Sequence, residues 1–405
     1  MTHKTTSPKT PTDPVVEHDV SSVLRLAQHL IQSPSQGGID SPDPVLTVLG
    51  DWLGAHHLAP YRLHTGNTLV GLACDITGTH PGPRYVLNAC IDTAPFGNEA
   101  AWEHPPTSGT IEDGRLYGRG SADSKTAAAI FAHIGIRLHA VRENLHGTLT
   151  LLFDADEHTG NFGGAKTFFG GPGAHTDGVM IGYPGSEHLV VGCRGVVRAR
   201  ISVHGHAGHT GSRHVTPNAI TKAAEIIQRL SRTVLPPTQT AFPQPRLTVT
   251  GCHGGDGPSI TPDRCNIAVD IRLTPDFDST HAHAILARTT AAIDETWPDT
   301  PPTGIIPTLD WPPYNIPEDD PLTRAILDAA RTHNLTVTPK IAGPSSIGNY
   351  LAGIGIPATA GFGLEYQHLH ATNENISITS IAPTQTVYQT ALRSLLMISD
   401  VCYER

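Results

Sequence analysis

Apolar residues recur every three to four positions in some stretches of the chain and run on without a break in others. The first pattern is typical of an amphipathic helix, and the second of a strand buried on both faces. Helical spacing predicts helices over Val16–Ile31, Val45–Ala55 and Lys125–Val141. Continuous runs predict strands at Thr68–Cys74, Tyr85–Cys90 and Gly147–Phe153. This strand–loop–helix alternation indicates a layered α/β sheet.

The order of predicted strands and helices changes at Gly195. The pattern there predicts strand, helix, two strands and helix, over Val196–Val203, Thr216–Leu230, Arg246–Thr250, Asn266–Leu273 and His281–Thr296. That order is typical of a small α+β sandwich with its helices on one face. Beyond the proline-rich stretch Pro301–Pro317, α/β alternation resumes with elements at Pro321–His333, Leu335–Thr338, Ser346–Ala352, Ala358–Gly361 and Ile381–Ile398.

The simplest interpretation of this order of elements is one α/β domain that is split in sequence by a smaller inserted domain. We predict a mixed sheet flanked by helices from residues 15–194 and 306–405, and the insertion at 195–305. A chain of 405 residues normally divides in this way, because single cores rarely grow beyond about 250–300 residues. Met1–Pro14 is rich in Thr, Pro and Lys and lacks the apolar region of a secretory signal, so it is predicted to be a flexible tail.

Composition narrows the possible partners. The chain carries 27 Lys plus Arg against 37 Asp plus Glu, a net charge of −10, which argues against nucleic acid or an anionic membrane. Its apolar runs fall short of the roughly 18–20 residues that span a bilayer. The six cysteines are dispersed and form no CxxC pair, which favours reduced thiols. We therefore expect a cytoplasmic protein with neither a membrane nor a nucleic acid as partner.

Carboxylate and imidazole groups gather in four segments, most of which follow a predicted strand: Cys90–Asp92, Gly118–Lys125, Asp156–His158 and His368–Glu374. Sites in open α/β sheets form at the carboxyl ends of strands. Each group alone has an ordinary explanation, since Asp caps helices and a buried His satisfies core hydrogen bonds. Together they favour a hydrolytic metal, because zinc binds His nitrogen and carboxylate oxygen and leaves one position for water.

The same segments carry, in order, a set of longer motifs: Cys90–Pro95, Leu116–Lys125, Ala155–Gly160, Gly182–Pro184, Gly205–Gly211 with Asn218–Ile220, Pro262–Cys265 with Asp270–Arg272, and His370–Glu374. With these motifs the chain resembles the zinc metallopeptidase family that includes acetylornithine deacetylase, succinyl-diaminopimelate desuccinylase, carboxypeptidase G and aminoacylase. The resemblance spans about residues 15–400. It implies that the split domain is catalytic and that the insertion is a lid or dimerisation domain.

The resemblance also implies a two-metal site, with three altered ligand positions in this chain. One metal would use Cys90, where the family has His, and Tyr183, where it has Glu; the other would use His158, in place of Glu, and His370, with Asp123 bridging. A phenol with a reference pKa of about 10 is a poor zinc ligand, although Cys90 could bind as thiolate. We predict one zinc per chain at Asp123, His158 and His370, with the other position weak or empty. Two His and one carboxylate also fit non-haem iron.

Three further residues take catalytic roles in the resemblance. Glu157 stands where the family has its general base, with a helix-capping acid as the alternative. Asp92 would orient the group at position 90. His209 resembles the histidine that reaches across a homodimer to stabilise the oxyanion, with a solvent-exposed loop His as the alternative.

The resemblance places three residues on the substrate side. Arg272 resembles the contact for a substrate carboxylate, and the alternative is an ordinary surface ion pair. Asn218 belongs to the Asn-Ala-Ile motif, and Ser345 to the family's substrate-side loop, which here lacks the common Asp.

Three functions remain open at this point. The leading one is a metal-dependent hydrolase of an amide or peptide bond in a small carboxylate-bearing substrate, such as an N-acyl amino acid or dipeptide. The second keeps the fold but forms or transfers an amide, as three altered ligands in one site would suit. The third is a non-catalytic binding protein, against which stand the retained Asp123, Glu157 and His370. The sequence does not name the substrate, because fold alone does not fix function.

Overall fold

The computed structural model describes residues 14–396. The predicted tail Met1–Pro14 therefore lies outside the described residues except for Pro14, which is the first residue of α1, and so do the last two residues of the helix predicted to Ile398. The described chain forms two compact units. Unit 1 runs to Val191 and includes Ile316–Lys340 and the residues from Ile356 on, and unit 2 combines Gly192–Asn315 with Ile341–Gly355. The domain boundaries predicted at 195 and 305 stay a prediction.

Unit 1 is built on a six-stranded sheet in the order β1–β2–β6–β3–β7–β17. The strands are β1 (Tyr61–Thr65), β2 (Thr68–Thr77), β3 (His80–Cys90), β6 (His146–Asp154), β7 (Gly178–Ile181) and β17 (Ala358–Ala360). β3, β6, β7 and β17 pair in parallel, and β1 and β2 form an antiparallel edge. The predicted mixed sheet is confirmed.

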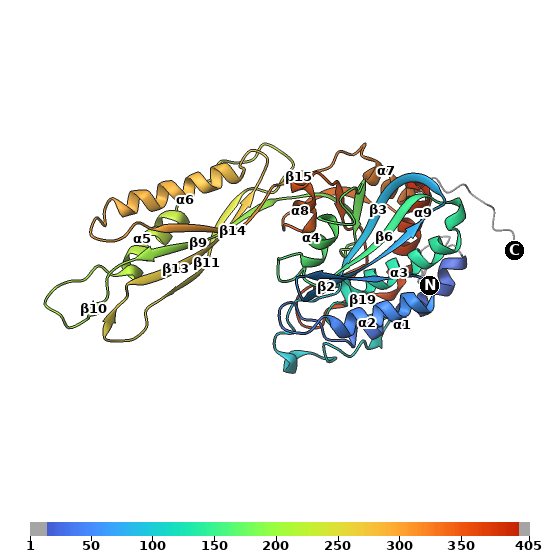
Figure 1. The fold of residues 1–405 in the computed structure, drawn as a ribbon, viewed down its shortest axis with the longest axis horizontal. Coiled ribbons are helices and arrows are strands. Elements are labelled where there is room, and N and C mark those ends of the chain that lie inside the picture. The colour runs from blue at the N-terminus through green and yellow to red at the C-terminus, as the bar shows by residue number, and fades with distance from the viewer. Residues whose placement is uncertain (1–13, 397–405) are drawn as a thin grey trace, which may run out of the picture. The chain divides into compact units, whose positions relative to one another are not determined.

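Helices cover both faces of this sheet. They are α1 (Pro14–Ile31), α2 (Asp43–Ala55), α3 (Thr126–Ala140), α4 (Gly163–Phe169), α7 (Pro321–Thr332) and α9 (Ile381–Leu395). Leu151 packs against Gly135 of α3, whereas Asp154 packs against Gly164 of α4. Because side chains alternate along a strand, residues 151 and 154 of β6 point to opposite faces. The predicted α/β layering is therefore confirmed (Figure 1).

A small second sheet of unit 1 joins distant segments. Its order is β18–β19–β5–β4, with β4 (Ile111–Glu112), β5 (Arg115–Tyr117), β18 (Tyr366–Gln367) and β19 (Asn375–Ser377). Tyr117 pairs with Asn375, so the segment that follows β5 lies beside the segment that precedes β19. Both segments carry residues of the candidate site.

Unit 2 contains a four-stranded antiparallel sheet in the order β11–β13–β9–β14. Its strands are β9 (Gly195–His204), β11 (Arg246–Gly254), β13 (Arg264–Leu273) and β14 (Gly304–Trp311), and α5 (Ala219–Ser231) and α6 (Ser279–Asp294) pack on one face (Figure 1). The α+β class predicted for the insertion is confirmed. The helix predicted from Thr216 instead begins at Ala219, because the Asn218 side chain accepts the N–H groups of Ile220 and Thr221.

Shorter elements complete the chain. They are α8 (Ile347–Gly353) and the strands β8 (His188–Cys193), β10 (Gly208–His209), β12 (Ile260–Thr261), β15 (Tyr314–Asn315) and β16 (Thr338–Ala342). The strand predicted at Leu335–Thr338 is wrong, since β16 begins where that prediction ends. Within residues 14–396, no helix is both long and apolar enough to cross a bilayer.

A buried ion pair links α5 and α6 of unit 2. The Lys222 ammonium is fully buried and lies 2.7 Å from Oδ1 of Asp294, the last residue of α6. Replacing Asp294 by Asn leaves a buried ammonium without its counter-charge, so we expect the free energy of unfolding to fall by about 3–5 kcal/mol. Lys222→Met, which removes the charge itself, should cost less. Denaturant unfolding at neutral pH compares them, and a larger loss for Lys222→Met would contradict this account.

The same pair predicts a pH dependence. Burial raises the pKa of Asp294, but Lys222 and Thr303 outweigh it and hold that pKa below its usual range. A carboxyl with a lowered folded pKa stabilises the fold above its unfolded pKa of about 3.9, and that stabilisation disappears as the pH falls through the folded value. The unfolding free energy of Asp294→Asn should therefore vary less with pH in this acid range than that of the wild type.

Candidate metal centre

Three parallel strands of unit 1 end at one edge of the sheet. Cys90, the last residue of β3, is the register partner of Asp154, the last residue of β6, and Asn88 is paired with Ile181 at the end of β7. The segments beyond these ends therefore start side by side (Figure 1). They hold Asp92, Glu157, His158 and Tyr183, as expected for the carboxyl edge of an α/β sheet.

Asp123 reaches this edge from a tight turn before α3. Gly120 has a φ of +86°, and a Cβ there would lie 2.7 Å from Thr93, so both conformation and space require glycine. One carboxylate oxygen, Oδ2, lies 2.9 Å from Nε2 of His370 and 3.6 Å from Nε2 of His158. The structure thus brings together the three residues predicted to hold zinc.

Glu374 anchors the turn that carries Asp123. Its Oε1 accepts the N–H groups of Gly120, Ala122 and Asp123 at 3.0, 3.0 and 3.3 Å. Its Oε2 pairs with the buried Arg119 guanidinium at 2.6 Å. Arg119 also donates to the carbonyl of His370, so the buried Arg119–Glu374 ion pair holds the backbone of both Asp123 and His370.

Asp92 holds the segment beyond β6. Its Oδ1 and Oδ2 accept the N–H groups of Glu157 and His158 at 3.2 and 2.8 Å. Its carboxylate is thus bonded to the backbone of the Glu157 segment, whereas the sequence expectation had it orienting position 90. Asp154 ties the far end of this segment by accepting the N–H groups of Gly164 and Ala165.

Glu157 shares a short hydrogen bond with Tyr183. The phenol donates to Oε1 of Glu157 at 2.7 Å, and Oε2 lies 3.3 Å from Nδ1 of His158. Burial raises the pKa of Glu157 to about 7, where a carboxyl can both take up and release a proton. Burial and the Glu157 charge raise the pKa of Tyr183, which keeps the phenol a donor at neutral pH.

The pKa values of Asp123, His158 and Cys90 are shifted by burial and by one another. Burial opposes ionisation of Asp123, but the facing imidazoles of His158 and His370 outweigh it and lower its pKa. Burial lowers the pKa of His158, yet Asp123, Asp92 and Cys90 together raise it. Burial and Asp123 raise the pKa of Cys90, whose thiol donates to Oδ1 of Asp123 at 3.2 Å.

The donor set fits one divalent cation. His158 is only 7% exposed, yet neither of its ring nitrogens has a hydrogen-bond partner among the described residues. A buried imidazole without a hydrogen bond is costly, and its Nε2 lies 3.6 Å from the Asp123 carboxylate, close to the His370 ring. Two imidazoles and a carboxylate form a common zinc donor set. A second group of candidate ligands, Cys90, Asp92 and His158, shares His158 with the first.

The other predicted site residues belong to unit 2. His209 is exposed in β10, where its Nδ1 accepts the N–H of Gly211. Arg272 is bound to Asp270 through Nε and donates to the hydroxyl of Ser345 at 3.2 Å. The Asn218 carboxamide caps α5. Arg272 and Ser345 are thus brought together, while His209 and Asn218 lie in other segments of the unit.

Sequence reasoning missed Arg119, the anchoring role of Glu374 and the bond from Tyr183 to Glu157. Arg119 and Glu374 stood inside quoted motifs, so their position in the sequence was a signal, but their mutual contact spans 255 residues. Tyr183 was noted only as a poor ligand.

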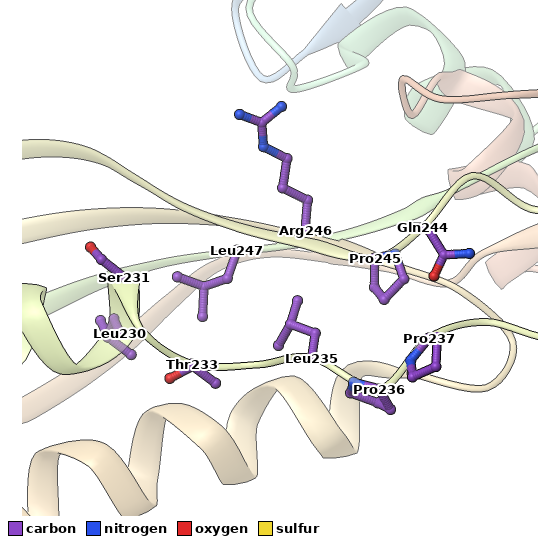
Figure 2. A pocket seen from close by; sticks show the side chains of 10 residues that line it. All are labelled: Leu230, Ser231, Thr233, Leu235, Pro236, Pro237, Gln244, Pro245, Arg246 and Leu247. Carbon is purple, nitrogen blue, oxygen red and sulfur yellow. The ribbon is translucent and has the colours of Figure 1, made fainter.

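A hollow of about 300 Å³ lies in unit 2 beside the end of α5 and the start of β11. Figure 2 shows the side chains that line it. Leu235 and Leu247 face one another across it, and Arg246 points away. Apart from Arg246, the lining residues are apolar or uncharged. This lining lacks the acids, bases and metal donors of the cluster in unit 1.

Comparison with known proteins gives a consistent result. The profile of "Peptidase family M20/M25/M40" matches residues 86–394. A succinyl-diaminopimelate desuccinylase from Methylobacillus flagellatus is 29% identical over 334 residues, which cover 78% of this chain and 84% of that protein. A metallo-carboxypeptidase of the M20 family from Sulfolobus solfataricus has a similar fold, with a TM-score of 0.76 and 17% identity over 93% of this chain and 99% of that one. A Bacillus subtilis protein described as a dinuclear metal-binding peptidase of the M20 family has a TM-score of 0.70 and 14% identity over 94% and 99% of the two chains.

Proposed function

The chain belongs to peptidase family M20/M25/M40 and is a metallo-hydrolase of that family, and from this premise we propose that it cleaves an amide or peptide bond in a small substrate that bears a carboxylate. N-acyl amino acids and dipeptides are the substrate class. The observation that carries the proposal is the convergence of Asp123, His158 and His370 beside Glu157 at one edge of the sheet.

We propose that Asp123, His158 and His370 hold one zinc ion per chain. Such an ion supplies Lewis acidity toward water and a carbonyl oxygen. The His158 ring, whose nitrogens make no hydrogen bond among the described residues although carboxylates lie 3.3–3.6 Å away, and the anionic Asp123 support this assignment. Glu374 and Arg119 hold the Asp123 backbone and the His370 carbonyl by hydrogen bonds, which is how residues around a metal site orient its ligands.

Glu157 is the proposed general base. Tyr183 occupies Oε1, so Oε2 is the oxygen that takes a proton from the attacking water and returns it to the leaving amine nitrogen. A pKa of about 7 suits both transfers. Asp92 holds the backbone of Glu157 and thereby fixes the direction of its side chain.

The substrate-side roles stay proposals. Asp270 already binds the Nε and Nη2 side of Arg272, so a substrate carboxylate is proposed to bind the Nη1 side, which donates to Ser345. His209 is proposed to act within a homodimer, as the resemblance implies, and Asn218 to contact substrate at the start of α5. The cytoplasm is the proposed compartment, on the strength of the dispersed cysteines.

Metal removal tests the function directly. Dialysis against a zinc chelator should abolish hydrolysis of an N-acyl amino acid panel, and one equivalent of Zn²⁺ per chain should restore it, because the donor set provides one complete site. Activity that survives complete removal of metal, verified by elemental analysis, would contradict the proposal. Restoration by Fe²⁺ but not by Zn²⁺ would identify the metal as iron.

A second candidate is transfer of the acyl group to an amine. The observation that favours it is the altered pair Cys90 and Tyr183, both neutral donors in a site where the family has ligands. Incubation with substrate and a high concentration of a second amine, followed by mass spectrometry, separates the two. A new amide as main product would establish transfer, and free amine and acid would establish hydrolysis.

A further inference from the structure

Two hydrogen bonds occupy the part of the site where the resemblance has its other metal. Cys90 donates its thiol to Oδ1 of Asp123 at 3.2 Å, and Tyr183 donates its hydroxyl to Oε1 of Glu157 at 2.7 Å. Cys90 therefore binds the acid of the Asp123, His158 and His370 donor set, and Tyr183 binds the acid beside that set.

The hydrogen bond from Cys90 gives the two carboxylate oxygens of Asp123 different partners. Oδ2 faces the imidazoles of His370 and His158, while Oδ1 accepts from the thiol. A carboxylate that bridges two metals through both oxygens offers one oxygen to each of them. Here the second oxygen is taken, and Ser124 Oγ, 3.2 Å from the Cys90 sulfur, closes the same side.

Tyr183 is held firmly from its backbone. A Cβ on Gly363 would lie 2.3 Å from the Tyr183 carbonyl oxygen, so the chain at 361–363 passes directly against it. Two backbone hydrogen bonds, each 2.8 Å long, join the same segments. The N–H of Gly185 donates to the Leu364 carbonyl, and the N–H of Gly363 donates to the Gly185 carbonyl. A hydroxyl on a backbone fixed in this way can fix the carboxylate that it binds.

We infer that Cys90 and Tyr183 close the second metal position of this chain and that Tyr183 is instead the positioning residue of Glu157. Tyr183 holds Oε1 and so keeps Oε2 beside the donor set, 3.3 Å from Nδ1 of His158, and the Cys90 thiol holds Asp123 as a ligand of one ion. The inference rests on the proposed function for the role of Glu157, but the closed position stands on the two hydrogen bonds alone.

The metal arm of the test needs no turnover. Zinc content after dialysis should be one equivalent per chain in the wild type and in Tyr183→Phe, and two equivalents in the double variant Cys90→His with Tyr183→Glu, which restores the ligands of the resemblance. The cobalt-substituted wild type should lack the near-ultraviolet charge-transfer absorption of a thiolate ligand. Two equivalents in the wild type, one in the double variant, or a thiolate band would each overturn the closed position.

The positioning arm uses a matched pair of variants. Tyr183→Phe removes one hydroxyl and should lower kcat by about 10–100-fold with little change in KM, as loss of a supporting hydrogen bond does. Tyr388→Phe removes another buried hydroxyl of unit 1, which donates to the Phe362 carbonyl, and should leave kcat unchanged. An unchanged kcat in Tyr183→Phe, or an equal fall in both variants, would overturn the positioning role.

Failure of the proposed function gives a different result. If the zinc-loaded wild type hydrolyses none of the N-acyl amino acids or dipeptides, the proposed function fails and the metal arm still decides the closed position. A crystal structure of Tyr183→Phe then decides positioning without any substrate. The Glu157 carboxylate should move by about 1 Å or more, a displacement that is large on the scale of catalytic alignment, and an unmoved carboxylate would overturn the inference.

Discussion

Replacing Glu157 by Gln should lower kcat by about 10²–10⁴-fold while the zinc content of the protein stays unchanged. Glutamine keeps a carbonyl oxygen that can accept the Tyr183 hydrogen bond, so the fold of the segment is preserved. What it loses is the ability to take a proton, which Glu157 has because burial raises its pKa to about 7. Steady-state kinetics and elemental analysis on the same preparation measure both quantities.

The neighbouring acid supplies the control. Asp156 lies in the same segment, where its carboxylate accepts from the Thr159 hydroxyl. Asp156→Asn should retain activity close to the wild type. Full activity in Glu157→Gln would remove Glu157 from the mechanism, and a loss of zinc in that variant would mean that it acts on the metal and not on the proton.

The second large effect is expected at Asp123. Asp123→Asn should weaken zinc binding by at least about 100-fold, the upper end of the cost seen for residues that merely support a ligand. The reason is that Asp123 faces both imidazoles with Oδ2 and supplies the negative charge of the donor set. Competition with a chelator of known affinity measures the change, and turnover should fall in parallel at limiting zinc.

Two further variants serve as comparisons for Asp123→Asn, one at a residue that supports the site and one far from it. Glu374→Gln disturbs the turn that carries Asp123 without touching the donors, and should cost about 10–100-fold in zinc affinity. Asp51→Asn, on the exposed side of α2, should change nothing. Wild-type zinc affinity in Asp123→Asn would show that the ion sits elsewhere, for instance at the group formed by Cys90, Asp92 and His158.

Most of the fold was predictable because local patterning reflects burial. The apolar run at Tyr85–Cys90 forms the end of β3, and the spacing in Lys125–Val141 forms α3, each within a residue or two at the carboxyl end of the element. β14 was missed, because it lies in a proline-rich stretch and carries Pro307 within an edge strand. Its alternation is too weak to separate it from a loop.

The sequence by itself determined which segments hold the candidate site residues, because the motif order places Asp123, His158 and His370 at turns that follow strands or precede helices. From the weak acidity of a phenol it also predicted that Tyr183 is a poor zinc ligand, which stays a prediction. Only the tertiary structure decided which side chains form hydrogen bonds with one another. Tyr183 binds Glu157, 26 residues away in the sequence, and Glu374 binds Gly120, 254 residues away. Periodicity reports how each residue faces the core, whereas such pairings depend on sheet register and chain crossing, which bring remote segments within hydrogen-bond distance only once the whole unit has folded.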